Sequence, residues 1–198
     1  MSKEVVSYML SGMDNMKSLQ VQLILQCAPF LKGIKIACIL NITEENSREL
    51  SEILEGTEIK FKILTRNHGK CLVFLYRNES FSKYLKRTDV REFLKSYGYE
   101  DAEPEKMLKR LSERVCKYSD GETRFPHEIG AFLDYPIDDV KCFIEKDGKD
   151  SLFSGYWKVY NNPGRAKMIF WAYDKAKTSA VNEYLVGKSI RDIAYVAA

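Results

Sequence analysis

The sequence lacks a long apolar run and a secretory leader. Its longest apolar stretch, residues 34–40, contains Lys35 and is far too short to span a bilayer. The N-terminal segment has no apolar core behind a basic start, as a secretory signal would have. We therefore predict a cytoplasmic protein that makes no membrane association.

The chain also lacks an excess of basic residues. It has 31 Lys and Arg against 28 Asp and Glu, which gives a formal net charge of +3. A non-specific nucleic-acid binder normally carries a marked basic excess, so this balance argues against a nucleic-acid partner. Basic residues do gather in one predicted hairpin: Lys60, Lys62, Arg66, Lys70 and Arg77. They could follow a nucleic-acid backbone, or they could form a solvated strand face or a lysine-protected sheet edge.

Metal-binding and common cofactor motifs are missing. The five cysteines, at positions 27, 38, 71, 116 and 142, form no Cys-x-x-Cys pair, and the odd count predicts separate reduced thiols. Only two histidines occur, and no His-x-x-x-His spacing is present. The sequence contains no Gly-x-x-x-x-Gly-Lys, Gly-x-Gly-x-x-Gly or Gly-x-Ser-x-Gly string. We therefore predict no metal and no cofactor.

What is present is typical of a globular chain. Hydrophobic residues make up 45% and charged residues 30% of the 198 positions. The 12 Tyr, 10 Phe and 2 Trp predict a core that contains many aromatic rings. A chain of this length buries roughly 70% of its unfolded surface without disulfide or metal support. We predict a single domain over residues 1–198, with a possible soft boundary at the polar segment 119–123.

The pattern of apolar residues predicts an α/β or α+β fold. A small mixed β-sheet, which includes a hairpin, is covered by several helices, and the C-terminal region is helical. Thr43 is expected to cap one helix, and the turn Asn67-His68-Gly69 to close the hairpin. The expected strands are residues 34–41, the hairpin 58–77, and 154–160. The expected helices lie within residues 1–29 and 44–56, and within the helical region 79–118, where Thr88 and Gly98 bracket a short helix and Pro104 opens a longer one. Two short helices that begin at Pro126 and Pro136, a long one over about 163–186 and a last short one from Ser189 follow.

Three segments resemble one known family. They are CAPFLKGIKIACIL at residues 27–40, FPHEIGAFLDYPIDDVKCFIEKDGK at 125–149 and SGYWKVY at 154–160. The chain resembles the bacterial family catalogued as domain of unknown function 3793, and the resemblance covers most of its length. Gln26, Asp134 and Phe153 depart from the family pattern, which often has His, Gly and Cys at these positions. The resemblance implies the fold of that family and no activity.

His127 and Glu128 are the first candidate site. Histidine titrates near neutral pH and binds metals, so the pair could act as a base or ligand set at a helix start. Adjacent helical residues point about 100° apart, however, and a Glu in a first helical turn is favoured by the helix dipole alone. Cys27 is a further weak candidate, since it closes a helix, where the dipole opposes formation of a thiolate.

Tyr156, Lys158 and Tyr160 form the second candidate site. If residues 154–160 form one alternating strand, Trp157 and Val159 face the core, and the two tyrosines share the opposite face with Lys158. Such a face could bind a ligand or a protein partner.

Two functions therefore stay open. The preferred hypothesis is a non-catalytic binding or adaptor protein for a small ligand or a protein partner, which uses Tyr156, Lys158 and Tyr160 or the basic hairpin. The alternative is an enzyme that uses His127, Glu128 and Cys27 in acid–base or thiol chemistry.

Overall fold

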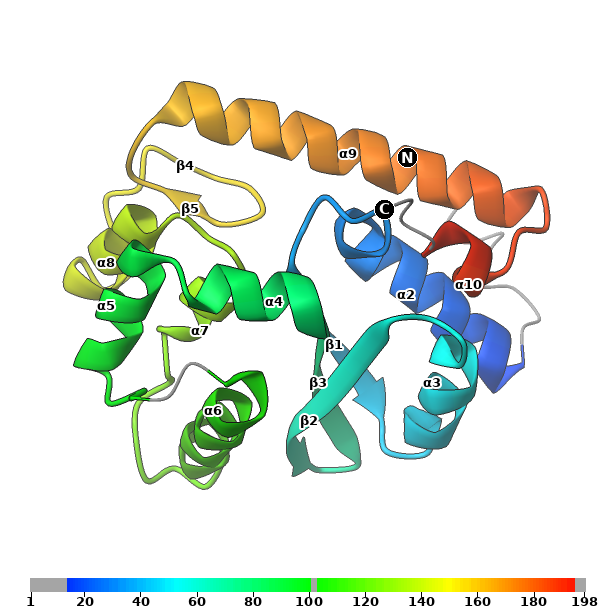
Figure 1. Ribbon diagram of the computed structural model, residues 1–198, viewed down its shortest axis with the longest axis horizontal. Coiled ribbons are helices and arrows are strands. Elements are labelled where there is room, and N and C mark those ends of the chain that lie inside the picture. The colour runs from blue at the N-terminus through cyan, green and yellow to red at the C-terminus, as the bar shows by residue number, and fades with distance from the viewer. Residues whose placement is uncertain (1–13, 101–102, 195–198) are drawn as a thin grey trace.

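The computed structural model describes residues 14–100 and 103–194 of the chain (Figure 1). The helices are α2 (Asn15–Leu31), α3 (Asn46–Leu54), α4 (Asn78–Leu85), α5 (Thr88–Ser96), α6 (Pro104–Ser119), α7 (Ile129–Phe132), α8 (Ile137–Glu145), α9 (Pro163–Leu185) and α10 (Ile190–Ile193). The strands are β1 (Ala37–Thr43), β2 (Ile59–Asn67), β3 (Lys70–Arg77), β4 (Phe153–Ser154) and β5 (Lys158–Val159).

The main sheet is antiparallel, with the strand order β1-β3-β2. Val73 in the central strand pairs with Leu40 on one side and with Ile63 on the other. The β2–β3 hairpin turns on His68 and Gly69, which both adopt a left-handed backbone with φ of 49° and 70°. Two consecutive residues of this kind form the turn whose twist matches that of the strands.

The central strand is buried on both faces because helices cover both sides of the sheet. Cys71, Val73 and Leu75 lie in one apolar cluster with α2, α3 and α10, whereas Phe74 and Tyr76 lie in a second cluster with α4 to α8. This arrangement follows the two-residue alternation of side chains along a strand. The sheet is therefore the middle layer of three (Figure 1).

A bulge in β2 changes which face its side chains occupy. The register shifts between Ile63 and Thr65, and Leu64 is fully buried in the cluster on the α6 side. Its carbonyl oxygen accepts hydrogen bonds from the Ser112 hydroxyl at 2.6 Å and the Cys116 thiol at 3.4 Å. The extra residue thus fastens the edge strand to α6.

Helix α9 bridges the two ends of the molecule. It lies across α2 at its C-terminal end and over the β4–β5 hairpin at its N-terminal end (Figure 1). Asn162 caps its first turn by accepting a hydrogen bond from the Arg165 backbone N–H. Near the other end, the Lys32 ammonium donates to Glu183 at 2.7 Å and so ties α9 to the end of α2.

The predicted α+β class with a hairpin and a helical C-terminal region is confirmed. The sheet is not mixed, since its strands are all antiparallel. Thr43 is not a helix cap, because β1 continues through it and α3 begins at Asn46. Residues 154–160 are not one strand and do not join the main sheet, because the chain turns back at residues 155–157 to form a separate hairpin.

The single-domain prediction stays a prediction. The segment 119–123 lies at the turn after α6, and Leu111 before it and Phe132 after it belong to the same apolar cluster. Among the described residues, no helix is both long enough and apolar enough to cross a bilayer.

Candidate functional site

Three cavities lie in a row around residues 123–148 and the β4–β5 hairpin. The first, the polar cavity, has a volume of about 670 Å³ and lies between α4, α5, α8 and α9. The second, the apolar pocket, has a volume of about 210 Å³ and lies beneath the hairpin. The third, the basic groove, has a volume of about 550 Å³ and runs beside α6. Each cavity shares wall residues with the next.

Tyr135 and Trp157 form the wall between the polar cavity and the apolar pocket. Their rings stack with centroids 5.6 Å apart and planes inclined by 30°, and both residues line both cavities. The Phe170 and Trp157 rings form a T-shaped pair with centroids 4.5 Å apart. Phe125 and His127 are likewise shared between the apolar pocket and the basic groove.

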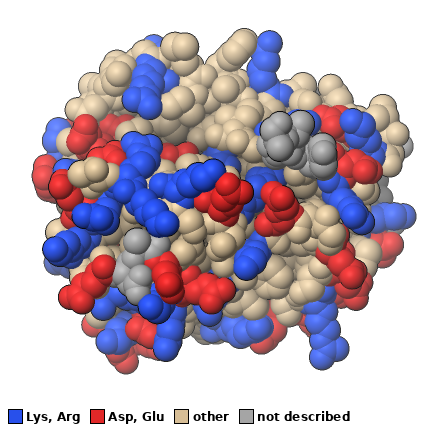
Figure 2. Space-filling model, viewed as in Figure 1, with Lys and Arg blue, Asp and Glu red and all other residues tan. Residues whose placement is uncertain are grey.

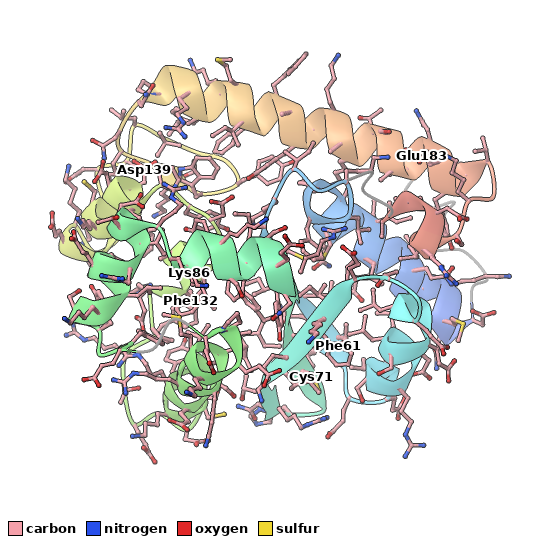
Figure 3. All side chains as sticks on the ribbon, in the orientation of Figure 1. Phe61, Cys71, Lys86, Phe132, Asp139 and Glu183 are labelled. Atoms are coloured by element: carbon pink, nitrogen blue, oxygen red, sulfur yellow. The ribbon has the colours of Figure 1, made fainter. Side chains whose placement is uncertain are left out.

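Asp139 on α8 fixes the hairpin in place. Its carboxylate is almost fully buried and accepts hydrogen bonds from the indole N–H of Trp157 at 2.8 Å, the backbone N–H of Tyr160 at 3.0 Å and the backbone N–H of Asn161 at 2.7 Å. The Asn161 side-chain amide adds a fourth at 3.2 Å. A buried carboxylate needs such donors, so the role of Asp139, labelled in Figure 3, is to hold the hairpin and with it Trp157.

The apolar pocket has aromatic walls. Trp157, Phe143 and Phe125 line it, and Gly130 in α7 brings the backbone close enough that an added Cβ would lie 3.0 Å from Val140. The Lys158 ammonium is at its edge, 5.7 Å from the centre of the Phe143 ring, and donates to the Gly148 carbonyl oxygen at 2.5 Å. An ammonium group has three donors, so it keeps capacity for a ligand.

His127 lies between two aromatic rings. Its imidazole is 5.3 Å from the Phe125 ring and 5.0 Å from the Phe143 ring, centroid to centroid, and it lines both the apolar pocket and the basic groove. It precedes α7 in a turn and is partly buried.

The neighbouring Glu128 is buried and already engaged. Its carboxylate accepts hydrogen bonds from the Tyr99 hydroxyl at 3.0 Å and from Arg114 Nε at 2.5 Å. Burial, and after it the charge of Glu128, raises the pKa of Tyr99, so this phenol stays a donor. The structure thus brings His127 and Glu128 to one groove and commits the carboxylate of Glu128 to α6.

Cys27 does not share a site with His127. It lies fully buried in the cluster of α2, on the opposite side of the sheet from α6 and α7. Burial, and after it the neighbouring Cys27 thiol, raises the pKa of Cys38. Burial also lowers the pKa of the adjacent Lys35, whose ammonium lies 4.9 Å from the centre of the Tyr135 ring.

The structure separates Tyr156, Lys158 and Tyr160. The Tyr156 hydroxyl donates to Asp174 on α9 at 2.8 Å, whereas Lys158 is exposed beside the apolar pocket. Tyr160 is buried, with the Lys146 ammonium 5.5 Å from its ring centre. The turn at Gly155 breaks the alternation that would have put the three side chains on one face; an added Cβ there would lie 2.1 Å from the Phe170 ring.

The polar cavity contains a carboxyl group that the sequence analysis named only as a departure from the family pattern and not as a site residue. Asp134 follows α7 with a left-handed φ of 60°, a conformation that Asp tolerates better than most residues. Burial raises the pKa of Asp134 to about 6, even though Lys35, Arg87 and Arg165 oppose the shift. It shares the cavity with the phenols of Tyr84 and Tyr173.

Two of the five basic residues of the hairpin are engaged in internal contacts, and Lys60, Lys62 and Lys70 are exposed. Arg77 donates to the carbonyl oxygens of Phe30 and Leu31 at 2.7 and 3.0 Å and to that of Ala194 at 3.0 Å, and so caps the ends of α2 and α10. Arg66 pairs with Glu44 at 3.0 Å. Figure 2 shows acidic and basic side chains interspersed over the face it draws.

The family assignment rests on a match that covers residues 23–194. This range matches the family model described as "Protein of unknown function (DUF3793)". The chain belongs to this family. No curated protein and no solved structure matches it. DUF3793 membership therefore confirms the resemblance and assigns no activity. Within the part of the DUF3793 chain that the structure describes, no three His, Cys, Asp or Glu residues are grouped as they would be to hold a metal ion.

Proposed function

We propose that this DUF3793 protein is a non-catalytic small-ligand-binding protein whose ligand enters the apolar pocket beneath the β4–β5 hairpin. The observation that carries the proposal is the pocket itself, which has walls from Trp157, Phe143 and Phe125 and the Lys158 ammonium at its edge. A pocket of this kind, mainly apolar with a few polar groups, is typical of ligand sites. The absence of a cofactor and a cytoplasmic location are part of the proposal.

The size and chemistry of the pocket define the ligand. Its volume of about 210 Å³ is below the roughly 300–1,000 Å³ of sites for drug-sized molecules, so the ligand is a small ring or a short acyl chain. Asp139 offers little to it because hairpin donors already occupy both of its carboxylate oxygens. The free charge at the edge is that of Lys158, which favours a carboxylate on the ligand.

The arrangement of Glu128 weighs against the enzyme alternative. A general base must reach the reacting group, and the carboxylate of Glu128 is instead paired with Arg114 and hydrogen-bonded by the Tyr99 hydroxyl. His127 has the apolar pocket on one side and could contact a ligand there. We therefore place His127 in the binding wall and assign it no proton transfer.

Trp157 offers a direct reporter of binding. The chain has two tryptophans; Trp157 is 7% exposed in the pocket wall and Trp171 is 63% exposed on the outer face of α9. The variant Trp171→Phe leaves Trp157 as the single indole. We expect 3-phenylpropionate or hexanoate, titrated to about 10 mM, to change its emission in a saturable way, since this concentration would saturate a site with a Kd near 1 mM.

Two lysine variants provide the matched comparison. In the Trp171→Phe background, Lys158→Met should weaken binding about tenfold or more, because it removes a charge-assisted contact to the carboxylate. Lys146→Met removes a lysine that lies over the Tyr160 ring and does not line the pocket, and it should leave binding unchanged. The proposal fails if neither probe gives a saturable change or if the two variants bind equally well.

A further inference from the structure

The polar cavity presents two hydrogen-bonding groups without a protein partner. Tyr173 on α9 is only 3% exposed and lines the cavity, yet its hydroxyl makes no hydrogen bond with any described residue. The Asp134 carboxylate likewise makes no hydrogen bond and no ion pair within residues 14–100 and 103–194. The Tyr173 side chain is buried and the Asp134 side chain is partly exposed, and both line the cavity, so their free hydroxyl and carboxylate groups are available to a ligand.

The charges that line the cavity nearly balance. Arg87 and Asp89 neutralise each other through two hydrogen bonds of 3.2 and 2.7 Å. The acids that remain are Glu92, Asp134 and Asp138, and the bases that remain are Lys141 and Arg165. A cavity that carries both signs complements a zwitterion better than a ligand of one charge.

The cavity also has aromatic walls and sufficient room. Phe93 on α5 and the stacked pair Tyr135 and Trp157 supply flat apolar surface. The volume of about 670 Å³ lies inside the roughly 300–1,000 Å³ range typical of small-molecule sites. An aromatic ring and a charged head group can therefore be accommodated together.

We propose that the polar cavity is a second ligand site, which binds a small zwitterion of the aromatic α-amino-acid type. Asp134 accepts hydrogen bonds from the ligand ammonium group, and Arg165 and the Tyr173 hydroxyl donate to its carboxylate. The ring of the ligand packs against Phe93 and the Tyr135–Trp157 wall. This site differs from the apolar pocket in its residues, its volume and the charge of its ligand.

The ionisation of Asp134 is coupled to such binding. The charged groups that face it are Lys35 from the α2–β1 connection, Arg87 from the α4–α5 connection and Arg165 from α9. The phenols of Tyr84 and Tyr173 stay protonated because burial raises the pKa of each. With the pKa of Asp134 at about 6, affinity for an ammonium group falls as the pH falls through this value.

Calorimetric titration with L-phenylalanine, L-tyrosine and L-tryptophan at pH 7.5 tests the proposal. We expect at least one of them to bind. For L-phenylalanine, 3-phenylpropionate lacks the ammonium group and 2-phenylethylamine lacks the carboxylate. Each should bind the polar cavity about tenfold or more weakly, because a charged hydrogen-bond partner is lost. If none of the three amino acids binds, the proposal is overturned.

Variants locate the bound amino acid. Asp134→Asn should weaken its binding about tenfold or more, and Asp134→Gly, which suits the left-handed backbone, should do the same with the fold retained. Asp150→Asn is the matched control, since Asp150 has a similar φ of 54° but is exposed and lines neither cavity. Equal binding by Asp134→Asn and Asp150→Asn would overturn the proposal.

One further variant separates the two sites. Lys158→Met should leave amino-acid binding unchanged, because Lys158 lines the apolar pocket and not the polar cavity. If Lys158→Met abolished amino-acid binding while Asp134→Asn did not, the amino acid would occupy the apolar pocket, and the second site would be rejected. Loss of 3-phenylpropionate binding alone would count against the proposed function and not against the polar cavity.

Discussion

Tyr135 and Trp157 stack with their ring centroids 5.6 Å apart, and the pair separates a polar cavity from an apolar pocket. Tyr135 follows α7, and Trp157 lies in the turn between β4 and β5, so the wall joins two segments more than 20 residues apart in the chain. Displacement of the hairpin would therefore change both cavities at once.

Asp139 should be the main determinant of where the hairpin sits. We expect Asp139→Ala to lower the free energy of unfolding by about 3 kcal/mol or more, because the N–H groups of Trp157, Tyr160 and Asn161 lose a buried, charged acceptor. In the Trp171→Phe background, the emission of Trp157 should shift to longer wavelength as its indole becomes hydrated. Urea unfolding and fluorescence spectra measure the two effects.

The neighbouring Asp138 provides the control for that experiment. It is exposed in the same helical turn, and Asp138→Ala should change stability by less than about 0.5 kcal/mol. Similar losses for the two alanine variants would show that Asp139 has no special role in holding the hairpin.

Asp134 should destabilise the protein at neutral pH. Its folded-state pKa of about 6 lies above the ordinary value of 3.8, so its favourable contribution is fully present below pH 3.8 and is lost as the pH rises through 6. Asp134→Asn should therefore be more stable than the parent by about 2 kcal/mol at pH 7.5 and equally stable near pH 3.5. Thermal unfolding across this range checks the sign, and a constant difference at all pH values would contradict it.

The Glu128–Arg114 pair should couple α6 to α7. A double-mutant cycle with Glu128→Gln and Arg114→Met should give an interaction energy of about 1–2 kcal/mol, because Glu128 is buried while Arg114 is 38% exposed and partly hydrated. The buried Tyr99 hydroxyl should keep a partner in Glu128→Gln and lose it in Glu128→Ala, which should therefore be the less stable of the two. Denaturant unfolding of the four proteins of the cycle and of Glu128→Ala measures this.

Glu183 should strengthen the docking of α9 on α2 in a pH-dependent way. Hydrogen bonds from Lys32, Ser179 and Lys188 lower its pKa from 4.5 to about 2. A depressed carboxyl pKa stabilises the fold above pH 4.5, and this contribution is lost as the pH falls through 2. Because the site is partly solvated, Glu183→Gln should cost about 1 kcal/mol or less at pH 7. Unfolding of the two proteins between pH 7 and pH 2 measures the difference, and a difference that does not shrink as the pH falls from 4.5 toward 2 would contradict this explanation.

Local patterns in the sequence predicted many of the elements correctly. The alternation around Asn67-His68-Gly69 indicated the β2–β3 hairpin, and Pro104, Pro163 and Ser189 marked the starts of α6, α9 and α10. These signals depend on backbone geometry within a few residues, so the elements they mark can be predicted without knowledge of the tertiary structure. The prediction of Thr43 as a helix cap was wrong, because its pairing with Lys70 extends β1 through this residue.

The sites were only partly predictable. His127 and Lys158 were named as candidates for different functions, and the structure places both at one pocket. Asp134 and Arg165 were not named as site residues, although Asp134 was noted as a departure from the family pattern and follows an apolar helix in Leu133-Asp134-Tyr135. Tyr160 was expected on an exposed face and is buried, because a turn replaces the straight strand.

The sequence by itself determined the family, the antiparallel hairpin and the starts of several helices, since each depends on neighbouring residues or on recognisable strings. Only the tertiary structure decided which charges are free. Arg77 and Glu128 are hydrogen-bonded to distant partners, whereas Asp134 makes no hydrogen bond or ion pair with any described residue. The cavities were likewise decided by the tertiary structure, because their walls combine segments from α4 to α9. Packing between segments that are distant in the chain produces no periodic pattern in the sequence.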